Sequence, residues 1–388
     1  MLYKPFQELK LSTLGLGNMR LPTVSGSKTA IDENKARQII EYAYEQGVNY
    51  FDTAYRYHGG ESETFVGKVL NQYPRNTWHL ATKMPGHMME NRNGKIVPIG
   101  YLAGETIHSI ADIFEDQLTR CGVDYFDFYL LHNVCETSLD FYTDEDMGVV
   151  EYLKEQKRAG RIRHLGISAH GRADTIERFL NLVDCVEFVQ LQLNYMDWFL
   201  QDARRKYEIV TARNLPVIVM EPVRGGRLAS LAPKAGDMLK AARPDDSHAA
   251  WAFRFLQALP NVSVVLSGMT TMDQLRENIS LFSRHNPLDT AETELLFKAV
   301  QGIMNLVPCT ACRYCCDACP KELDIPKLIS LYNETSNEKT GIINFTLNAM
   351  KADELPSACL KCGECMKLCP QNIDIPGVLA RYAGLLAT

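Results

Sequence analysis

The spacing of apolar residues changes regularly along the first 290 residues. Short runs rich in β-branched and aromatic residues alternate with stretches in which apolar residues recur every three or four positions, the period of an amphipathic helix. The expected strands are residues 12–17, 48–52, 77–82, 125–131, 162–168, 188–193, 216–220 and 263–267. The expected helices include residues 34–46, 105–121, 148–158, 174–182 and 248–259.

This alternation favours one α/β fold over its rival. Eight strand–helix units suit a parallel (β/α)8 TIM barrel, which typically takes about 250 residues. A doubly wound sheet that binds a dinucleotide would place three spaced glycines after its first strand. The chain has Gly15-Leu16-Gly17-Asn18-Met19-Arg20 there and lacks the third glycine. We therefore expect a barrel over residues 1–290.

Composition and charge narrow the class of protein. The 388 residues are 46% hydrophobic and 23% charged, and 41 Lys and Arg against 47 Asp and Glu give a net charge of −6. A nucleic-acid-binding protein would carry a basic excess. There is no apolar run of about 18 residues, the length that crosses a bilayer, and no signal-like start. We expect a cytoplasmic protein that binds neither nucleic acid nor membrane.

Cysteines are concentrated at one end of the chain. Nine of the 12 lie in the last 80 residues, and only Cys121, Cys135 and Cys185, expected in the core, precede them. The run Cys309-x2-Cys312-x2-Cys315-x3-Cys319-Pro320 returns 50 positions later as Cys359-x2-Cys362-x2-Cys365-x3-Cys369-Pro370. A repeat of this kind indicates one structural unit used twice. We expect a second domain over residues 300–388.

The spacing of these cysteines resembles that of ferredoxins with two [4Fe–4S] clusters, in which the fourth cysteine of each run ligates the other cluster. One cluster would take Cys309, Cys312, Cys315 and Cys369, the other Cys359, Cys362, Cys365 and Cys319, and Cys316 would be spare. Structural zinc needs neither the third cysteine nor the Cys-Pro, and a reducing compartment disfavours disulfides. Helical patterns between the two runs make the expected domain small, mainly helical and ferredoxin-like.

Four side chains that could act in catalysis lie at the ends of three consecutive expected strands. These are Asp52 and Tyr57 after the second strand, Lys83 after the third, and His132 after the fourth. Barrel enzymes place their chemistry at the carboxyl ends of the strands. A tyrosine is a weak acid at neutral pH unless a cation stabilises its phenolate. Lys83 would supply that charge, Asp52 would hold Lys83, and His132 would orient a substrate carbonyl.

The stretch Asp52-Thr53-Ala54-Tyr55-Arg56-Tyr57-His58-Gly59-Gly60 and the later Lys83 and Leu-Leu-His132 resemble the aldo-keto reductase family, in its iron–sulfur branch, over residues 10–285. The resemblance implies that Asp52, Tyr57, Lys83 and His132 form the catalytic tetrad. It also implies an NADP(H) cofactor bound across the barrel mouth, with Tyr57 as the general acid.

The same resemblance implies where the cofactor binds. Ser168 and Gln192 would bind the carboxamide, although Ala169 replaces the family's asparagine and Met220 its stacking aromatic residue. The remaining expected cofactor positions are Gly17, Asn18, Met19, Asp52, Thr270, Gln274, Glu277 and Asn278, the last four at the adenosine end. Arg20, Trp78, Arg224 and the segment 85–104 are candidates for lining the mouth.

Together these features predict an oxidoreductase that interconverts a small-molecule carbonyl and an alcohol. A nicotinamide transfers two electrons at once, whereas an iron–sulfur cluster transfers one. The C-terminal domain therefore either passes electrons to a ferredoxin-like carrier or has a structural role only. An electron-transfer or redox-sensing protein whose barrel binds a cofactor without turnover is the alternative.

Overall fold

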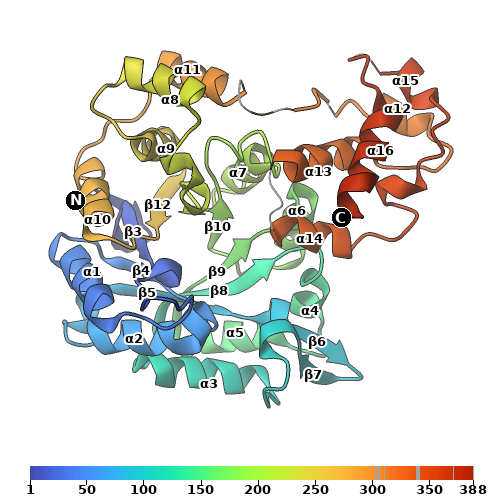
Figure 1. The fold of residues 1–388 in the computed structure, drawn as a ribbon. Coiled ribbons are helices and arrows are strands. Elements are labelled where there is room, and N and C mark those ends of the chain that lie inside the picture. The colour runs from blue at the N-terminus through green and yellow to red at the C-terminus, as the bar shows by residue number, and fades with distance from the viewer. Residues whose placement is uncertain (302–303, 305, 310, 338–340, 370, 388) are drawn as a thin grey trace.

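The computed structural model, which describes residues 1–301, 304, 306–309, 311–337, 341–369 and 371–387, contains a closed barrel of parallel strands (Figure 1). Its eight strands are β3 (Leu14–Gly17), β4 (Tyr50–Asp52), β5 (His79–Met84), β8 (Phe126–Val134), β9 (Ile162–Ala169), β10 (Phe188–Gln192), β11 (Val217–Met220) and β12 (Val262–Ser267). The last strand pairs with the first, Val265 beside Leu14, which closes the barrel. The expected (β/α)8 fold is therefore confirmed, and each of the eight expected strands overlaps one of these.

At least one helix follows each barrel strand, and eight of these helices surround the barrel. They are α1 (Glu33–Glu45), α2 (Glu61–Leu70), α3 (Ile110–Cys121), α5 (Val149–Arg158), α6 (Ala173–Leu182), α7 (Ala203–Ala212), α9 (His248–Gln257) and α10 (Met272–Leu281). Helix α3 begins five residues later than expected because Ser109 caps it: the Ser109 hydroxyl accepts a hydrogen bond from the Asp112 amide at 3.2 Å. Helix α2 buries two polar residues, Ser62 and Glu63, beside its apolar face.

A hairpin closes the amino end of the barrel. Strands β1 (Tyr3–Phe6) and β2 (Leu9–Ser12) pair antiparallel ahead of the first barrel strand. The Phe6 ring packs edge-on against Phe128 and Phe188, with centroids 5.2 and 5.9 Å away. This plug fills the interior with apolar side chains. The carboxyl end of the strands is therefore the end available for chemistry.

Two expectations about the barrel mouth are corrected or refined. Trp78 does not line the mouth, because it is fully buried at the start of β5, at the amino end of the barrel. The segment 85–104, a candidate for lining the mouth, contains a second antiparallel hairpin. Its strands are β6 (Met89–Arg92) and β7 (Lys95–Pro98). Helices α4 (Leu139–Thr143), α8 (Pro233–Ala242) and α11 (Thr290–Gln301) complete this part of the chain.

The C-terminal region is helical and repeats itself. Helix α12 (Tyr314–Asp317) and the longer α13 (Ile325–Asn337) correspond to α15 (Glu364–Lys367) and α16 (Ile375–Leu386), and α14 (Gly341–Asn348) lies between the two copies. A separate apolar core, built largely from α13 and α16, holds the copies together. Pro370 of the second cysteine run lies outside the described residues. In the described part of the chain, no helix is long and apolar enough to span a membrane.

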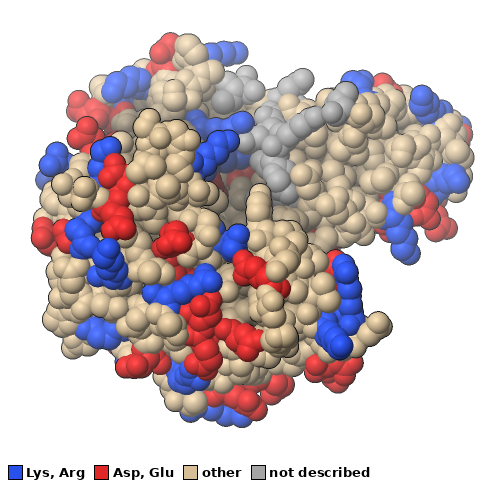
Figure 2. Space-filling view, turned by 60° about the horizontal axis from the view of Figure 1, so that its bottom comes forward, with Lys and Arg blue, Asp and Glu red and all other residues tan. Residues whose placement is uncertain are grey.

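Charges of both signs are interspersed over the face of the barrel seen in Figure 2. Opposite charges close together on the surface form pairs such as Lys68–Glu33 and Arg92–Glu90, at 2.9 and 2.8 Å. This view gives no sign of a single-sign field of the kind that binds a polyanion.

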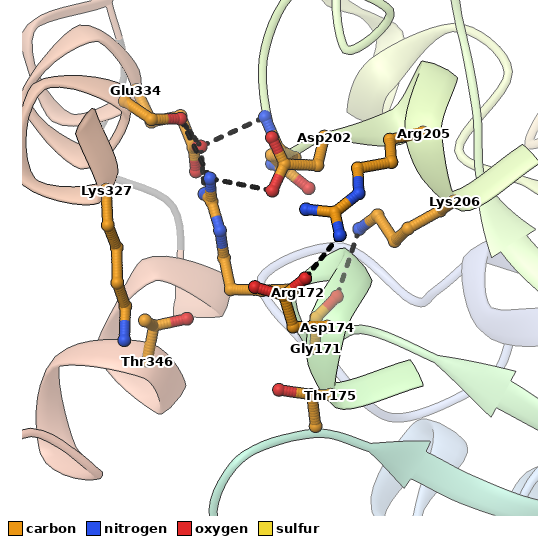
Figure 3. Close-up of polar contacts among 12 residues, drawn as sticks. Gly171, Arg172, Asp174, Thr175, Asp202, Arg205, Lys206, Lys327, Glu334 and Thr346 are labelled. Carbon is orange, nitrogen blue, oxygen red and sulfur yellow. Dashed lines mark hydrogen bonds and ion pairs between the residues drawn. The ribbon is translucent and has the colours of Figure 1, made fainter. Parts of the chain in front are cut away.

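A buried ion pair joins the C-terminal region to the barrel (Figure 3). Arg172, at the start of α6, contacts Glu334 of α13 at 2.5 Å and Asp202 at 2.9 Å. The Glu334 carboxylate also accepts the backbone N–H of Gln201 at 3.0 Å. The side chain of Glu334 is 3% exposed and that of Arg172 is 12% exposed. Loops that follow β9 and β10 are thus fastened to the helix that leads away from the first cysteine run.

Removing Glu334 should weaken the folded chain measurably. Glu334→Ala leaves the buried Arg172 guanidinium with the partly exposed Asp202 carboxylate and the Ser330 hydroxyl, which accepts from it at 2.8 Å. Breaking a buried pair from one side costs about 3 kcal/mol. We expect a loss of about that size in the free energy of unfolding, measured in urea. Glu294→Ala, an exposed glutamate on α11, is the control and should change it by less than about 0.5 kcal/mol. Equal effects of the two variants would contradict the buried pair.

Candidate active site and cluster-binding cysteines

The four tetrad residues of the sequence prediction lie together at the carboxyl end of the barrel. Asp52 ends β4, Lys83 lies on β5, and His132 lies on β8. Tyr57 opens the short 3₁₀ turn Tyr57–Gly60. Within that turn His58, Gly59 and Gly60 have φ angles of 54°, 70° and 105°, a left-handed run that glycine adopts without strain. This run turns the chain sharply into α2 and holds Tyr57 at the mouth.

Lys83 is the most completely buried charge of the site. Its Nζ donates to Asp52 Oδ1 at 2.8 Å, to Asp52 Oδ2 at 2.7 Å and to the Thr53 carbonyl at 2.7 Å. Burial by itself would lower the pKa of Lys83, but the Asp52 carboxylate and Tyr57 outweigh it and leave the pKa raised. Lys83 is therefore a fixed cation at neutral pH.

Tyr57 lies directly beside this cation. Lys83 Nζ is 5.1 Å from the centre of the Tyr57 ring. Burial raises the pKa of Tyr57 above its ordinary value, and the Lys83 charge opposes that rise. The Lys83 charge therefore opposes the effect of burial on the pKa of Tyr57 but does not outweigh it. The phenol is protonated at neutral pH and lies next to a charge that stabilises its anion.

His132 lies beside Tyr57, on β8, the strand that pairs with β5. The two rings are 6.2 Å apart at an interplanar angle of 82°. The Tyr142 hydroxyl donates to the His132 carbonyl at 2.6 Å, which fixes the end of β8. Burial lowers the pKa of His132 well below its ordinary range, with His87 and Lys83 adding to the effect. His132 is therefore a neutral imidazole that can donate one hydrogen bond.

The residues expected at the nicotinamide end lie on neighbouring strand ends. Ser168 is the second-last residue of β9. Its Oγ accepts a hydrogen bond from the Asn133 N–H at 2.8 Å. Gln192 ends β10 and donates to Asp197 Oδ2 at 2.9 Å. Met220 ends β11. All three lie at the same mouth as the tetrad.

Gly17, at the end of β3, leads into Asn18, whose amide donates to the Asp52 carbonyl at 2.9 Å. The Oδ1 atom of Asn18 is buried and has no hydrogen-bond partner among the described residues. Met19 is 55% exposed. A buried amide oxygen of this kind suits a ligand hydroxyl or amide, so the residues present fit a nicotinamide cofactor.

The residues expected at the adenosine end gather at the start of α10. Gln274 forms a capping box with Thr271, its Oε1 accepting the Thr270 and Thr271 amides at 2.9 and 3.2 Å. The structure therefore gives the Gln274 side chain a capping role that the sequence analysis did not anticipate. Asn278 is buried and donates to Ser267 Oγ at 3.0 Å, and Glu277 is exposed. Thr270 Oγ1 donates to the Arg20 carbonyl at 3.0 Å.

Two hollows in the C-terminal region are lined by cysteines from both runs. The lining of the first includes Cys359, Cys362, Cys365 and Cys319, and that of the second Cys309, Cys312, Cys315 and Cys369. Each hollow thus contains three cysteines of one run and the last cysteine of the other. Cys316 lines neither hollow. Four thiols around one apolar hollow are a donor set that suits an iron–sulfur cluster.

Sequence reasoning missed two histidines beside the tetrad. His87 lies in the 3₁₀ turn Gly86–Met88 after β5, and its ring is 4.6 Å from that of His132. His170 follows β9 directly, and its amide donates to the Val134 carbonyl at 3.0 Å. A His two residues after Ser168 was the available signal, because inward positions alternate along a strand.

Fold and site define the class, a (β/α)8-barrel oxidoreductase joined to a cysteine-rich iron–sulfur module. The chain belongs to the aldo/keto reductase family, whose model matches residues 13–300. A model of the 4Fe-4S dicluster domain matches residues 308–373. The family resemblance seen in the sequence is thereby confirmed.

Known proteins similar to this chain include two bacterial enzymes. The uncharacterized oxidoreductase YqkF of Bacillus subtilis is 29% identical over 70% of this chain and 87% of its own length. The NADH-specific methylglyoxal reductase of Escherichia coli is 26% identical over 76% of this chain and 97% of its own length. Among solved structures, the holo form of an aldo-keto reductase of Bacillus halodurans has a TM-score of 0.59 and 27% identity, covering 76% of this chain and 95% of that one.

Proposed function

We propose that this protein interconverts a carbonyl and an alcohol with NADP(H) as the hydride carrier. The observation that carries the proposal is the buried Lys83–Asp52 pair beside Tyr57, with the neutral His132 on β8, the strand next to that of Lys83. In general acid catalysis, a positioned proton donor must lie beside the reacting oxygen. Tyr57 is the donor of this site that has a stabilising cation next to it.

Each residue of the tetrad would have its own role in carbonyl reduction. When bound, a nicotinamide cofactor would supply the hydride for the carbonyl carbon. Tyr57 gives its hydroxyl proton to the carbonyl oxygen, and Lys83 stabilises the tyrosinate that remains. His132 donates a hydrogen bond to the same oxygen and orients it. Asp52 holds Lys83 in place, and in the oxidative direction Tyr57 takes the proton back.

The cofactor would lie across the mouth with its carboxamide at Ser168 and Gln192. Gly17, Asn18, Met19 and Met220 would line its nicotinamide half, with the thioether of Met220 packing against the ring. Thr270, Glu277 and Asn278 would receive the adenosine half, near the start of α10.

Gln192→Ala should weaken the binding of NADPH by about tenfold, because one hydrogen bond from a buried amide is lost. Calorimetric titration of the cluster-loaded protein measures the change. Gln72→Ala, an exposed glutamine at the amino end of the barrel, is the control and should bind normally. No affinity of the intact protein for NADPH or NADH would refute the proposed cofactor.

A hydride and a proton together complete the reduction of a carbonyl, so the reaction needs no electrons from the clusters. We therefore assign the clusters a separate role. Cys312 and Cys362 are exposed, and the nearby Tyr314, Leu360 and Leu368 are 58%, 60% and 47% exposed. We propose that these exposed side chains contact a partner protein. The module would exchange single electrons there with a ferredoxin-like carrier.

The experiment is to add a reduced ferredoxin under anaerobic conditions and follow the cluster absorbance. We expect the clusters to become reduced. Clusters that stay oxidised would indicate that the module has a structural role only.

A further inference from the structure

Helix α13 of the C-terminal region contacts two loops of the barrel that follow expected cofactor residues. The loop after β9 connects Ser168 to Arg172, and the loop after β10 begins at Gln192. The Glu334 carboxylate of α13 contacts the Arg172 guanidinium at 2.5 Å and accepts the Gln201 N–H at 3.0 Å. One side chain of the iron–sulfur module therefore joins both loops.

A chain of hydrogen bonds connects Glu334 to the side chain of Gln192. Gln192 Nε2 donates to Asp197 Oδ2 at 2.9 Å, and the Asp197 carbonyl accepts the Leu200 N–H at 3.1 Å. The next residue along the chain is Gln201, whose N–H donates to Glu334. The position of the Gln192 amide thus depends on how the far end of this loop is held.

The far end of this loop has a backbone conformation that needs support from its surroundings. Gln201 and Asp202 are consecutive residues with φ angles of 53° and 51°, in the left-handed region that residues other than glycine rarely adopt. Such a conformation persists only where surrounding contacts hold it. The Gln201 N–H is held by Glu334, and the Asp202 carboxylate pairs with Arg172 at 2.9 Å. The buried Arg172–Glu334 pair therefore supports this turn at both residues.

A second contact from the module supports the loop after β9. One oxygen of the Glu136 carboxylate accepts the Arg172 N–H at 2.7 Å, and the other accepts the hydroxyl of Thr346, on α14, at 3.4 Å. Lys206 of α7 donates to the Gly171 carbonyl at 3.2 Å (Figure 3). The backbone just beyond the end of β9 is therefore held at two consecutive residues.

Helix α13 is itself held by the core of the C-terminal region. Leu328, Ile329 and Leu331 of this helix are buried in the apolar core that α13 shares with α16. Ile325 lines both cysteine hollows, and Ile329 lines the second. The helix that contacts the barrel loops is thus also part of the wall around the cysteines.

We propose that Glu334 and Arg172 are positioning residues for the nicotinamide end of the cofactor, so that the iron–sulfur module completes the cofactor site of the barrel from outside it. The inference rests on the proposed function and deepens it, because it gives the module a role in cofactor binding that needs no electron transfer. Both residues would act through the loops after β9 and β10. The adenosine end should not depend on them, since α10 lies across the barrel from α13 (Figure 1).

Titration of the cluster-loaded Glu334→Ala variant with NADPH tests this role. Calorimetry at a temperature where the variant is folded should show binding at least about fivefold weaker than in the unmodified protein. Adenosine 2′,5′-bisphosphate, which has the adenosine end of NADPH and no nicotinamide, should bind both proteins equally. Ser336→Ala is the matched control and should bind NADPH normally. Ser336 is an exposed residue of the same helix, and its hydroxyl donates to the Tyr332 carbonyl at 2.7 Å.

A second variant covers the case in which Glu334→Ala does not fold. Glu334→Gln keeps an acceptor for the Gln201 N–H and removes the charge that pairs with Arg172, so its NADPH affinity should be reduced, but by less. The same comparison with the bisphosphate then decides.

Three results would contradict the proposal. Unchanged NADPH affinity in the Glu334 variant would overturn the positioning role and leave the proposed function standing. Equal losses of affinity for NADPH and for the bisphosphate would overturn it as well, because they would indicate a general loosening of the barrel. No affinity of the unmodified protein for NADPH would overturn both the positioning role and the proposed cofactor.

Discussion

Tyr57→Phe should lower the rate of carbonyl reduction by about 10²- to 10⁴-fold, the range that general acid catalysis contributes. The substitution removes the proton donor and keeps the ring that lies 5.1 Å from Lys83 Nζ. Cofactor binding should therefore survive. Single-turnover oxidation of bound NADPH, followed by stopped flow with a responsive aldehyde, separates the chemical step from binding.

Two further variants sharpen the test of Tyr57. Tyr55→Phe is the matched control, since the Tyr55 hydroxyl donates to Asp116 at 2.8 Å, outside the tetrad, and turnover should be retained. Lys83→Met should be about as damaging as Tyr57→Phe, because the phenolate loses its cation and Asp52 is left buried without its partner. Turnover by Tyr57→Phe at the unmodified rate would make the tetrad a structural element and move the search for the redox step to the clusters.

Cys319→Ser should reduce the iron content from about eight atoms to about four, because we propose that each chain holds two four-iron clusters. Cys319 belongs to the first run but lines the same hollow as Cys359, Cys362 and Cys365. The cluster lost should therefore be the one held mainly by the second run. Iron and labile sulfide assays on anaerobically purified protein measure the loss.

Double variants decide which cysteines share a cluster. Cys319→Ser combined with Cys362→Ser should lose no more iron than Cys319→Ser alone, since both changes affect one cluster. Cys319→Ser combined with Cys312→Ser should lose nearly all iron. Cys316→Ser is the control and should keep full iron content. Additive loss in the first pair would refute the exchange of fourth cysteines, and stoichiometric zinc without sulfide would refute the clusters altogether.

The barrel could be predicted from the sequence because its signal is local. Inward and outward positions alternate within each strand, and the helices between them carry their own apolar period. The cysteine runs are also local signals, since their ligand spacing is a property of a few consecutive residues.

The rest depended on contacts between distant parts of the chain. Arg172 and Glu334 are 162 positions apart, and nothing in the neighbourhood of either residue marks it as half of a buried pair. His87 comes from a turn after β5 and His132 from β8, and only the pairing of β5 with β8 brings them together. The Gln274 cap, by contrast, is local, since Thr271-x-x-Gln274 has the sequence pattern of a capping box.

The sequence by itself thus determined the order of the elements, because it follows from periodicity within short segments. The tetrad and the two cysteine sets came from resemblance to known families, and they stay predictions. Only the tertiary structure decided how the C-terminal region attaches to the barrel and which side chains surround Tyr57. Barrel closure and helix docking join residues far apart in the chain, and the free energy of such contacts depends on three-dimensional proximity, which local sequence does not encode.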